Sequence, residues 1–320
     1  MSISEAKKIK NIVVIGGGTG TFAVLSALKQ YPVDLTAVVS MADDGGSTGI
    51  LRDQYGVLPP GDARRALVAL SPSPVLRDLF NYRFANGDLE GHSFGNLFLS
   101  ALEKIHGNFA LAVSEAGRVL NIKGTVLPVT LDNVRLVARL ANGKLIRGET
   151  NIDISRERAR AAISHLWLEP KAMLNPAASE ALQKADLIII GPGDLYTSII
   201  PNLLVAGMSE DLRQSKAKKV YVCNVMTKYG ETHGYKAEDF VCAIERYLGN
   251  GILDYALFNK TRPARAILAQ YKKKRAELVA LPRAMRTKKP KYIIADLLDG
   301  GNLVRHSSDK KFAKILLSLV

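Results

Sequence analysis

A glycine-rich run near the N-terminus, Gly16–Gly20 (GGGTG), constrains the fold of this chain more than any other feature. It follows a β-branched segment, Ile12–Ile15, and precedes Phe22–Lys29, whose apolar residues recur at helical spacing. A strand, a tight glycine turn and a helix in this order are typical of the first unit of a parallel α/β sheet. The backbone N–H groups and the positive end of such a helix favour a phosphate.

Two interpretations of this turn stay open. As a dinucleotide fingerprint, Gly18, Gly20 and Ala23 satisfy G-x-G-x-x-A, but the more usual placement two residues earlier would need glycine at Thr21. No lysine follows, so the run is not a P-loop. Alternatively, the glycines serve only to pack the helix tightly against the strand.

The order of strand, loop and helix returns along the chain. Leu35–Ser40 leads into the loop Met41–Gly49, and Leu187–Ile190 and Val220–Val225 each precede a polar or glycine-containing loop. This alternation predicts an α/β fold of the Rossmann-like, doubly wound type with a mostly parallel sheet. Parallel strands with right-handed crossovers end along one edge, where open α/β sheets bind ligands, so we expect the loops to meet there.

One region departs from this alternation. Val126–Thr130, Val134–Leu140 and Lys144–Thr150 are strand-like, and Asn142-Gly143 is preferred in two-residue hairpin turns. We interpret residues 124–153 as an antiparallel β insertion. No linker separates it from its flanks, so residues 1–320 are expected to form a single Rossmann-like domain, with residues 262–291 as a basic arm that could be mobile.

The composition excludes several classes of protein. No apolar stretch reaches the roughly 18 to 20 residues that span a bilayer, and the N-terminus lacks a signal sequence, so we expect a cytoplasmic protein without membrane insertion. The two cysteines and five histidines lack metal-ligand spacing. The net charge of +14 would suit an anionic partner, but the basic residues are spread out and form no recognisable nucleic-acid module. We expect no specific nucleic acid.

Acidic residues in two loops are candidates for catalysis. Asp43 and Asp44 precede glycines and hydroxyls, which together offer oxygen ligands for a hard cation, although such a loop is also an ordinary turn. Asp62 precedes the predicted helix Ala63–Leu70, where it would act as an N-cap. Asp44 and Asp62 are the candidate ligands for Mg²⁺. Two arginines in the first turn of that helix are unfavourable unless an anion lies close.

Further polar residues follow the other strands and precede the other helices. Asn96 could cap the predicted helix Leu97–Lys104 or bind a ligand through both donor and acceptor. The run GPGDLYTS, which contains Gly193, Thr197 and Ser198, forms a second predicted anion-binding turn, and Asn224 ends the next strand. No G-x-S-x-G elbow is present, so the sequence shows no activated nucleophile.

Eight segments in order resemble the gluconeogenesis-factor (YvcK-like) family, which is related to the phospholactate transferase CofD. They are GGGTGT, ADDGGSTGILR, PPGDARRALVAL, GHSFGNLFLSAL, VLPVT, GPGDLYTSIIPNLL, VYVCNVMT and NLVRH. The resemblance implies a Rossmann-like core, a cytoplasmic bacterial protein and a nucleotide-sugar ligand of the UDP-N-acetylglucosamine type. It also implies a link to cell shape and wall synthesis during gluconeogenic growth, with protein partners in that synthesis and a homo-oligomeric state left open.

The resemblance and the residue chemistry together define a candidate binding site. We expect it to consist of Gly17, Gly18, Thr19, Gly20, Asp43, Asp44, Asn96, Gly193, Thr197, Ser198, Asn224, Tyr271 and Arg305. The alternative is a Mg²⁺-dependent CofD-like transferase of a phosphate-linked group from a nucleotide-activated donor. The segment ADDGGSTGILR resembles the factor branch, which favours a binding factor. The family usually has serine at Asp194, and a carboxylate there would repel a phosphate unless a cation intervenes.

Overall fold

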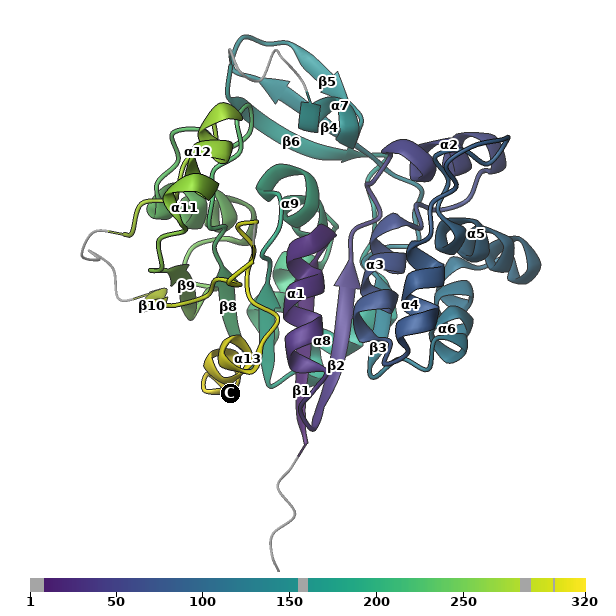
Figure 1. Cartoon of the computed structure of the whole chain (residues 1–320), viewed down its shortest axis with the longest axis horizontal. Coiled ribbons are helices and arrows are strands. Elements are labelled where there is room, and N and C mark those ends of the chain that lie inside the picture. Colours follow the sequence, from purple (N-terminus) through teal and green to yellow (C-terminus); the bar gives the residue numbers. More distant parts are fainter. Residues whose placement is uncertain (1–8, 155–160, 283–288, 302) are drawn as a thin grey trace, which may run out of the picture.

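The computed structural model describes residues 9–154, 161–282, 289–301 and 303–320. Its main sheet has seven strands in the order β10-β9-β8-β7-β1-β2-β3, and all its recorded pairings are parallel (Figure 1). The strands are β1 (Lys10–Gly16), β2 (Val33–Val39), β3 (Thr125–Pro128), β7 (Leu187–Ile190), β8 (Lys218–Val222), β9 (Tyr255–Asn259) and β10 (Lys291–Ala295). The predicted doubly wound α/β class is therefore confirmed.

Helices connect and cover these strands, and α1 lies in front of the sheet in Figure 1. They are α1 (Gly18–Leu28), α2 (Gly46–Tyr55), α3 (Gly61–Leu70), α4 (Pro74–Asn81), α5 (Phe94–His106), α6 (Phe109–Val119), α8 (Pro176–Lys184), the π-helix η1 (Leu195–Ile199), α9 (Ile200–Leu203), α10 (Met208–Gln214), α11 (Ala237–Leu248), α12 (Arg265–Lys273) and α13 (Lys310–Leu317). Within the described residues, no helix is both long and apolar enough to cross a membrane.

A second, antiparallel sheet has the strand order β5-β4-β6 and lies beyond the carboxyl ends of the main strands (Figure 1). It consists of β4 (Arg135–Leu140), β5 (Leu145–Arg147) and β6 (Ile163–Glu169), and α7 (Glu149–Ile154) follows β5. We call these four elements the antiparallel unit. Its position places α7 opposite the loops that leave the main sheet.

The predicted insertion at residues 124–153 has the wrong boundaries. Thr125–Pro128 pairs in parallel with β2 and so belongs to the main sheet, while Ile163–Glu169 completes the antiparallel sheet. The predicted strand Lys144–Thr150 ends at Arg147, because Gly148 has φ +93° and a helix starts at the next residue. Part of the predicted basic arm forms α12, and residues 283–288 of that arm lie outside the described residues.

The central strands of the main sheet are buried on both faces. Ile12–Ile15 of β1 and Leu187–Ile190 of β7 are almost inaccessible to solvent, which explains their continuous apolar sequence. At the other end of the chain, α13 packs against α1, with Phe312 and Leu316 fully buried. This packing returns the segment before α13 to the loops that follow β1 and β7.

Candidate functional site

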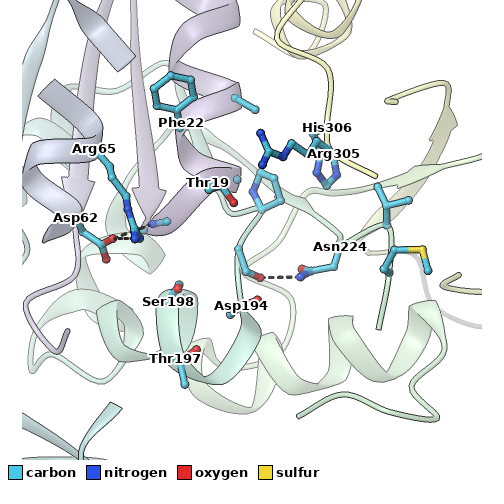
Figure 2. Close-up of a pocket in the computed structure, with 18 of the residues that line it drawn as sticks. Thr19, Phe22, Asp62, Arg65, Asp194, Thr197, Ser198, Asn224, Arg305 and His306 are labelled. Carbon is cyan, nitrogen blue, oxygen red and sulfur yellow. Dashed lines mark hydrogen bonds and ion pairs between the residues drawn. The ribbon is translucent and has the colours of Figure 1, made fainter. Parts of the chain in front are cut away.

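A cavity of about 750 Å³ opens at the carboxyl edge of the main sheet. Strand β7 pairs with both β1 and β8, so the loops that follow these three strands lie side by side around it. Figure 2 shows side chains that these loops and the segment before α13, with Arg305 and His306, direct toward the cavity. Its volume is in the range of small-molecule sites, roughly 300 to 1,000 Å³.

Most of the predicted binding residues line this one cavity. They are Gly17, Gly18, Thr19, Gly20, Asp43, Gly193, Thr197, Ser198, Asn224, Tyr271 and Arg305, and the candidate Asp62 joins them. Asp44 and Asn96 are not among the lining residues. The expectation that loops distant in sequence converge at this edge agrees with the structure.

The glycine loop is held by a carboxylate from another element. Helix α1 begins at Gly18, which has φ +69°, and Gly18 N donates to Asp62 Oδ1 at 2.9 Å. The predicted N-cap role of Asp62 is wrong, because Pro60 occupies the N-cap position of α3 and Asp62 lies inside the first turn. A side chain at Gly17 would overlap the Asp62 carboxylate, so glycine is required for this approach.

Two carboxyl groups with raised pKa values, Asp62 and Glu149, and the guanidinium of Arg65 line the cavity. Burial and the charge of Asp43 raise the pKa of Asp62 to about 6, against the opposing effect of Arg65. Burial, followed by the charges of Asp43 and neighbouring acids, raises the pKa of Glu149 to about 8. Arg65 Nη1 lies 3.5 Å from Asp62 Oδ1, and its side chain keeps 44% of its surface exposed. Arg65 can therefore contribute positive charge at the glycine loop.

Asn96 serves the protein interior instead of the predicted ligand. Ser93 caps α5 by accepting from Asn96 N, which excludes the predicted capping role of Asn96. The Asn96 side chain is 3% exposed, accepts from Arg64 Nε at 3.0 Å and donates to Ser47 Oγ at 3.2 Å. Its donor and acceptor are both used by neighbouring elements, so its placement does not support a ligand contact.

Asp44 anchors the antiparallel unit. Its carboxylate accepts from Glu149 N at 3.1 Å and from Thr150 N at 2.8 Å, which are the first N–H groups of α7. Arg135 Nη1 of β4 lies 3.7 Å from Asp44 Oδ2. Both carboxylate oxygens are thus occupied away from the cavity, and Asp43 and Asp62 remain as the acidic residues of these two loops that line it.

The loop after β7 packs directly on the glycine loop. A Cβ atom at Gly20 would overlap the Pro192 carbonyl, which makes glycine necessary where the two loops touch. Asn224 Nδ2 donates to Gly193 O at 2.8 Å, as Figure 2 shows. Thr197 Oγ1 and Asn224 Oδ1 are buried, and neither has a hydrogen-bond partner among the residues that the structure describes. Such atoms fit a ligand with polar groups.

The segment before α13, which contains Val304, Arg305 and His306, closes a further side of the cavity. Val304 N donates to Tyr271 Oη at 3.2 Å, which joins this segment to α12. His306 Nε2 lies 3.0 Å from Cys223 O, and its ring stacks on Phe312. Burial lowers the pKa of His306 to about 4, so the neutral ring anchors the segment that carries Arg305. His306 was not predicted as a site residue from the sequence, although it stands within the segment NLVRH.

Asp194 pairs with a cation that the sequence alone did not connect with it. Lys228 Nζ lies 2.7 Å from Asp194 Oδ2, so an ammonium compensates the carboxylate next to the predicted anion-binding turn. Cys223, by contrast, is buried in the core, and burial raises the pKa of its thiol far above the usual range. The thiol of Cys223 therefore belongs to the core, and the polar groups that line the cavity include carboxylates, hydroxyls and cations.

Comparisons with known proteins give consistent matches over most of the chain. A family model described as "2-phospho-L-lactate transferase CofD" matches residues 12–298. The chain is 44% identical over 315 residues to the gluconeogenesis factor of Halalkalibacterium halodurans, covering 97% of this chain and 96% of that protein. It is 47% identical over 251 residues to the gluconeogenesis factor of Bacillus subtilis, covering 78% of each. A crystal structure of a UPF0052-family protein from Bacillus halodurans matches with a TM-score of 0.92 and 41% identity, covering 98% of this chain and 100% of that one.

Proposed function

Because the chain belongs to the CofD family, together with the gluconeogenesis factors it resembles, we propose that it is a binding factor for a nucleotide sugar of the UDP-N-acetylglucosamine type. In this proposal the protein acts in the bacterial cytoplasm. It supports cell shape and wall synthesis during gluconeogenic growth through protein partners in that synthesis.

The observation that carries this proposal is the convergence of two glycine-bearing loops on one cavity. The loop after β1 ends in the N-terminus of α1, the loop after β7 leads into η1, and the backbone of both loops lines the cavity. Arg65 and Arg305 add positive charge on different sides of it. A pyrophosphate carries negative charge on two adjacent phosphates and suits this arrangement.

The uncharged part of the cavity suits a sugar and a base. Thr197, Ser198 and Asn224 offer hydroxyl and amide groups, which bind sugar hydroxyls without adding charge. The ring of Tyr271 in α12 offers an aromatic surface on which a base can stack. Thr21 replaces the glycine of the usual dinucleotide fingerprint, and its hydroxyl donates to Gly17 O, so we expect NAD(P) to bind poorly.

Isothermal titration calorimetry with UDP-N-acetylglucosamine, UDP, GDP and NADH, each with and without Mg²⁺, tests this proposal. We expect the UDP-sugar to bind most tightly, and at about 100 times its Kd to stabilise the protein by roughly 2.7 kcal/mol in a thermal-shift measurement. Tight binding of NADH together with no heat from UDP-sugars would overturn it.

A second candidate function is Mg²⁺-dependent transfer of a phosphate-linked group, as in the CofD transferases. Asp43 and Asp62 both line the cavity and offer oxygen ligands for a hard cation near the glycine loop. From the sequence, Asp44 and Asp62 were the candidate Mg²⁺ ligands. Because the Asp44 carboxylate binds the first N–H groups of α7, we propose Asp43 as a ligand in place of Asp44. Mg²⁺-dependent turnover of a nucleotide-linked donor, lost in Asp43→Asn, would establish this function.

A further inference from the structure

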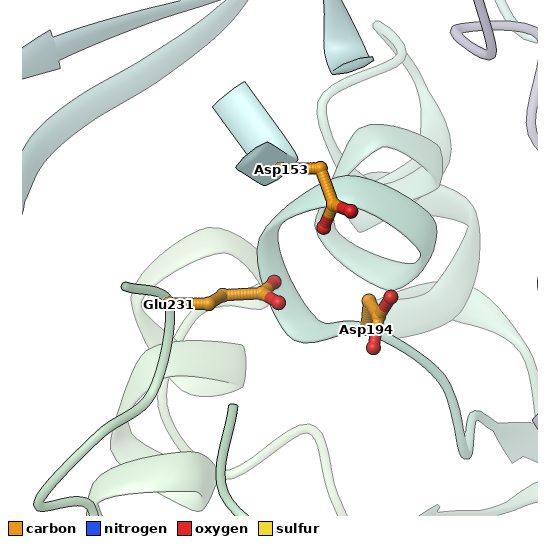
Figure 3. A group of neighbouring side chains, drawn as sticks. All are labelled: Asp153, Asp194 and Glu231. Carbon is orange, nitrogen blue, oxygen red and sulfur yellow. The ribbon is translucent and has the colours of Figure 1, made fainter. Parts of the chain in front are cut away.

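Three carboxylates from separate parts of the chain surround one lysine beside the ligand cavity. Asp153 in α7, Asp194 before η1 and Glu231 after β8 each offer an oxygen atom, and these atoms lie within 4.8 Å of one another. Figure 3 shows the three side chains converging. Lys228 Nζ lies 2.7 Å from Asp194 Oδ2 and 3.7 Å from Glu231 Oε2, and it also contacts Asp153 Oδ1. The ammonium is thus hydrogen-bonded to Asp153 and Asp194 and forms an ion pair with Glu231.

The three carboxylate oxygens lie close enough to one another to hold a hard divalent cation if Lys228 were absent. Such cations take several carboxylate oxygens, and Glu231 is buried with only 1% of its side chain exposed. Burial by itself lowers the pKa of Lys228, but the charges of Glu231 and Asp194 outweigh it and raise the pKa above that of an ordinary lysine. Lys228 therefore stays protonated and supplies the compensating positive charge.

The carboxylates that Lys228 holds are connected to the ligand-facing turn. Glu231 Oε1 accepts from Tyr196 N at 2.7 Å, which fixes the start of η1. The backbone carbonyl of Asp194 accepts from Ser198 N at 2.8 Å and so closes the turn that carries Thr197 and Ser198 into the cavity wall. Through Asp153, the same ammonium attaches α7 to this turn. One cation therefore joins the antiparallel unit to the loop after β7.

We propose that Lys228 is a positioning residue whose ammonium takes the place of a divalent cation at Asp153, Asp194 and Glu231, and so holds the turn Gly193–Ser198 ready for ligand without a metal at this position. The effect on ligand binding rests on the proposed nucleotide-sugar function. The replacement of a metal by the lysine does not, and it can be measured without any nucleotide.

The first test measures Mn²⁺ binding by electron paramagnetic resonance in the full chain without nucleotide. We expect Lys228→Gln to bind one more Mn²⁺ than the wild type, because three carboxylates then lack their cation. Adding Asp153→Asn to that variant should remove the extra ion. If Lys228→Gln proves unstable, its melting temperature should rise with Mn²⁺, and Asp153→Asn should abolish the rise. Absence of any gain over the wild type would overturn the proposal.

The second test measures affinity for UDP-N-acetylglucosamine. Lys228→Gln should bind roughly tenfold more weakly without metal, equal to about 1.4 kcal/mol, and added Mn²⁺ should restore the affinity. Lys228→Arg keeps the charge and should stay close to the wild type, as should Lys184→Met, which removes an exposed lysine paired with Glu180. Unchanged metal-free affinity in Lys228→Gln would contradict the positioning role. If the wild type itself binds no UDP-sugar, the proposed function fails, while the Mn²⁺ measurement still decides the role of Lys228.

Discussion

Among single residues, Asp62 directly limits how the cavity can receive an anion. Its carboxylate accepts from Gly18 N, so the first amide of α1 already has an anionic partner. A phosphate at this helix end must therefore use the next amides, at Thr19 and Gly20, together with the guanidinium of Arg65. The buried carboxylate both shapes the glycine loop and opposes a negatively charged ligand.

The stability of the protein should respond to the charge of Asp62. The folded state raises its pKa from 3.8 to about 6, so ionisation destabilises the fold at pH values above 6, and this penalty disappears as the pH falls below about 4. Asp62→Asn keeps an oxygen acceptor for Gly18 N and removes the charge. It should raise the free energy of unfolding at pH 8 by at most roughly 3 kcal/mol, and change little at pH 4.

Urea unfolding at pH 8, 6 and 4 measures this effect. Asp62→Ala is the control, because it removes both the charge and the acceptor of Gly18 N and should stabilise less than Asp62→Asn at pH 8. An Asp62→Asn variant that is equally destabilised at all three pH values would contradict the prediction.

Gly18 tests whether the glycine loop binds ligand or only packs. An ideal Cβ at Gly18 would lie 3.7 Å from Ser198 Oγ and 3.9 Å from Arg65 Nη1, on the side where the two loops face each other. Gly18→Val should therefore abolish UDP-sugar binding in calorimetry, while its positive φ adds roughly 1 to 3 kcal/mol of strain. Gly56→Val carries similar strain at φ +63° and should bind normally. Normal binding by a folded Gly18→Val protein would mean that the loop serves packing alone.

At the level of secondary-structure elements, periodicity predicted the main sheet because its central strands are continuous apolar runs. The prediction was less successful at the edges. Thr125–Pro128 is short and was grouped with the following hairpin, but it pairs in parallel with β2, a contact that local sequence does not encode. Ile163–Glu169 escaped prediction, since it pairs with β4 across an intervening helix. Pairing between distant segments decides such strands, and propensity contributes little.

The role of Asp44 at the start of α7 gives a prediction at this scale. Asp44→Ala removes the acceptor of Glu149 N and Thr150 N and should lower the free energy of unfolding by about 0.5 to 2 kcal/mol. Any effect of Mg²⁺ on nucleotide affinity should be unchanged. Asp53→Ala is a matched control, because Asp53 also pairs with Arg135 but caps no helix, and it should be close to neutral. Loss of a Mg²⁺ effect in Asp44→Ala would return Asp44 to the list of metal ligands.

For the whole molecule, the sequence predicted which loops converge but not how their side chains are paired. Convergence follows from topology, because parallel strands end at one edge of the sheet. The pairing of Asn96 with Arg64, and of Lys228 with Asp194, joins residues from different loops or helices and depends on the exact placement of these elements. Consequently most of the binding residues predicted from the sequence line the cavity, whereas the sequence misjudged Asn96, Asp44 and the capping role of Asp62, and it missed other lining residues such as Glu149 and His306.

The distribution of charge over the cavity distinguishes a binding factor from a metal-dependent enzyme. Asp62 in α3 and Glu149 in α7 have pKa values raised to about 6 and about 8, so both ionise as the pH rises from 5 to 9. The pyrophosphate of a UDP-sugar keeps its two negative charges throughout this range, because both of its ionisable protons are strongly acidic. Without a metal, the newly ionised carboxylates repel the ligand, and affinity should fall with rising pH.

Calorimetry with UDP-N-acetylglucosamine between pH 6 and pH 8.5, with and without Mg²⁺, measures this fall. We expect it to be several-fold, because a repulsion that shifts a pKa by one unit corresponds to about 1.4 kcal/mol of binding free energy. Glu149→Gln removes the group with the higher pKa and should flatten the upper half of the profile, whereas Glu115→Gln, on the exposed face of α6, should leave it unchanged. A catalytic Mg²⁺ bound by Asp43 and Asp62 would give the opposite trend, because the metal binds only ionised carboxylates and would make affinity rise with pH. An affinity that increases with pH only when Mg²⁺ is present would therefore contradict metal-free binding and favour the Mg²⁺-dependent function, which turnover of a nucleotide-linked donor would then establish.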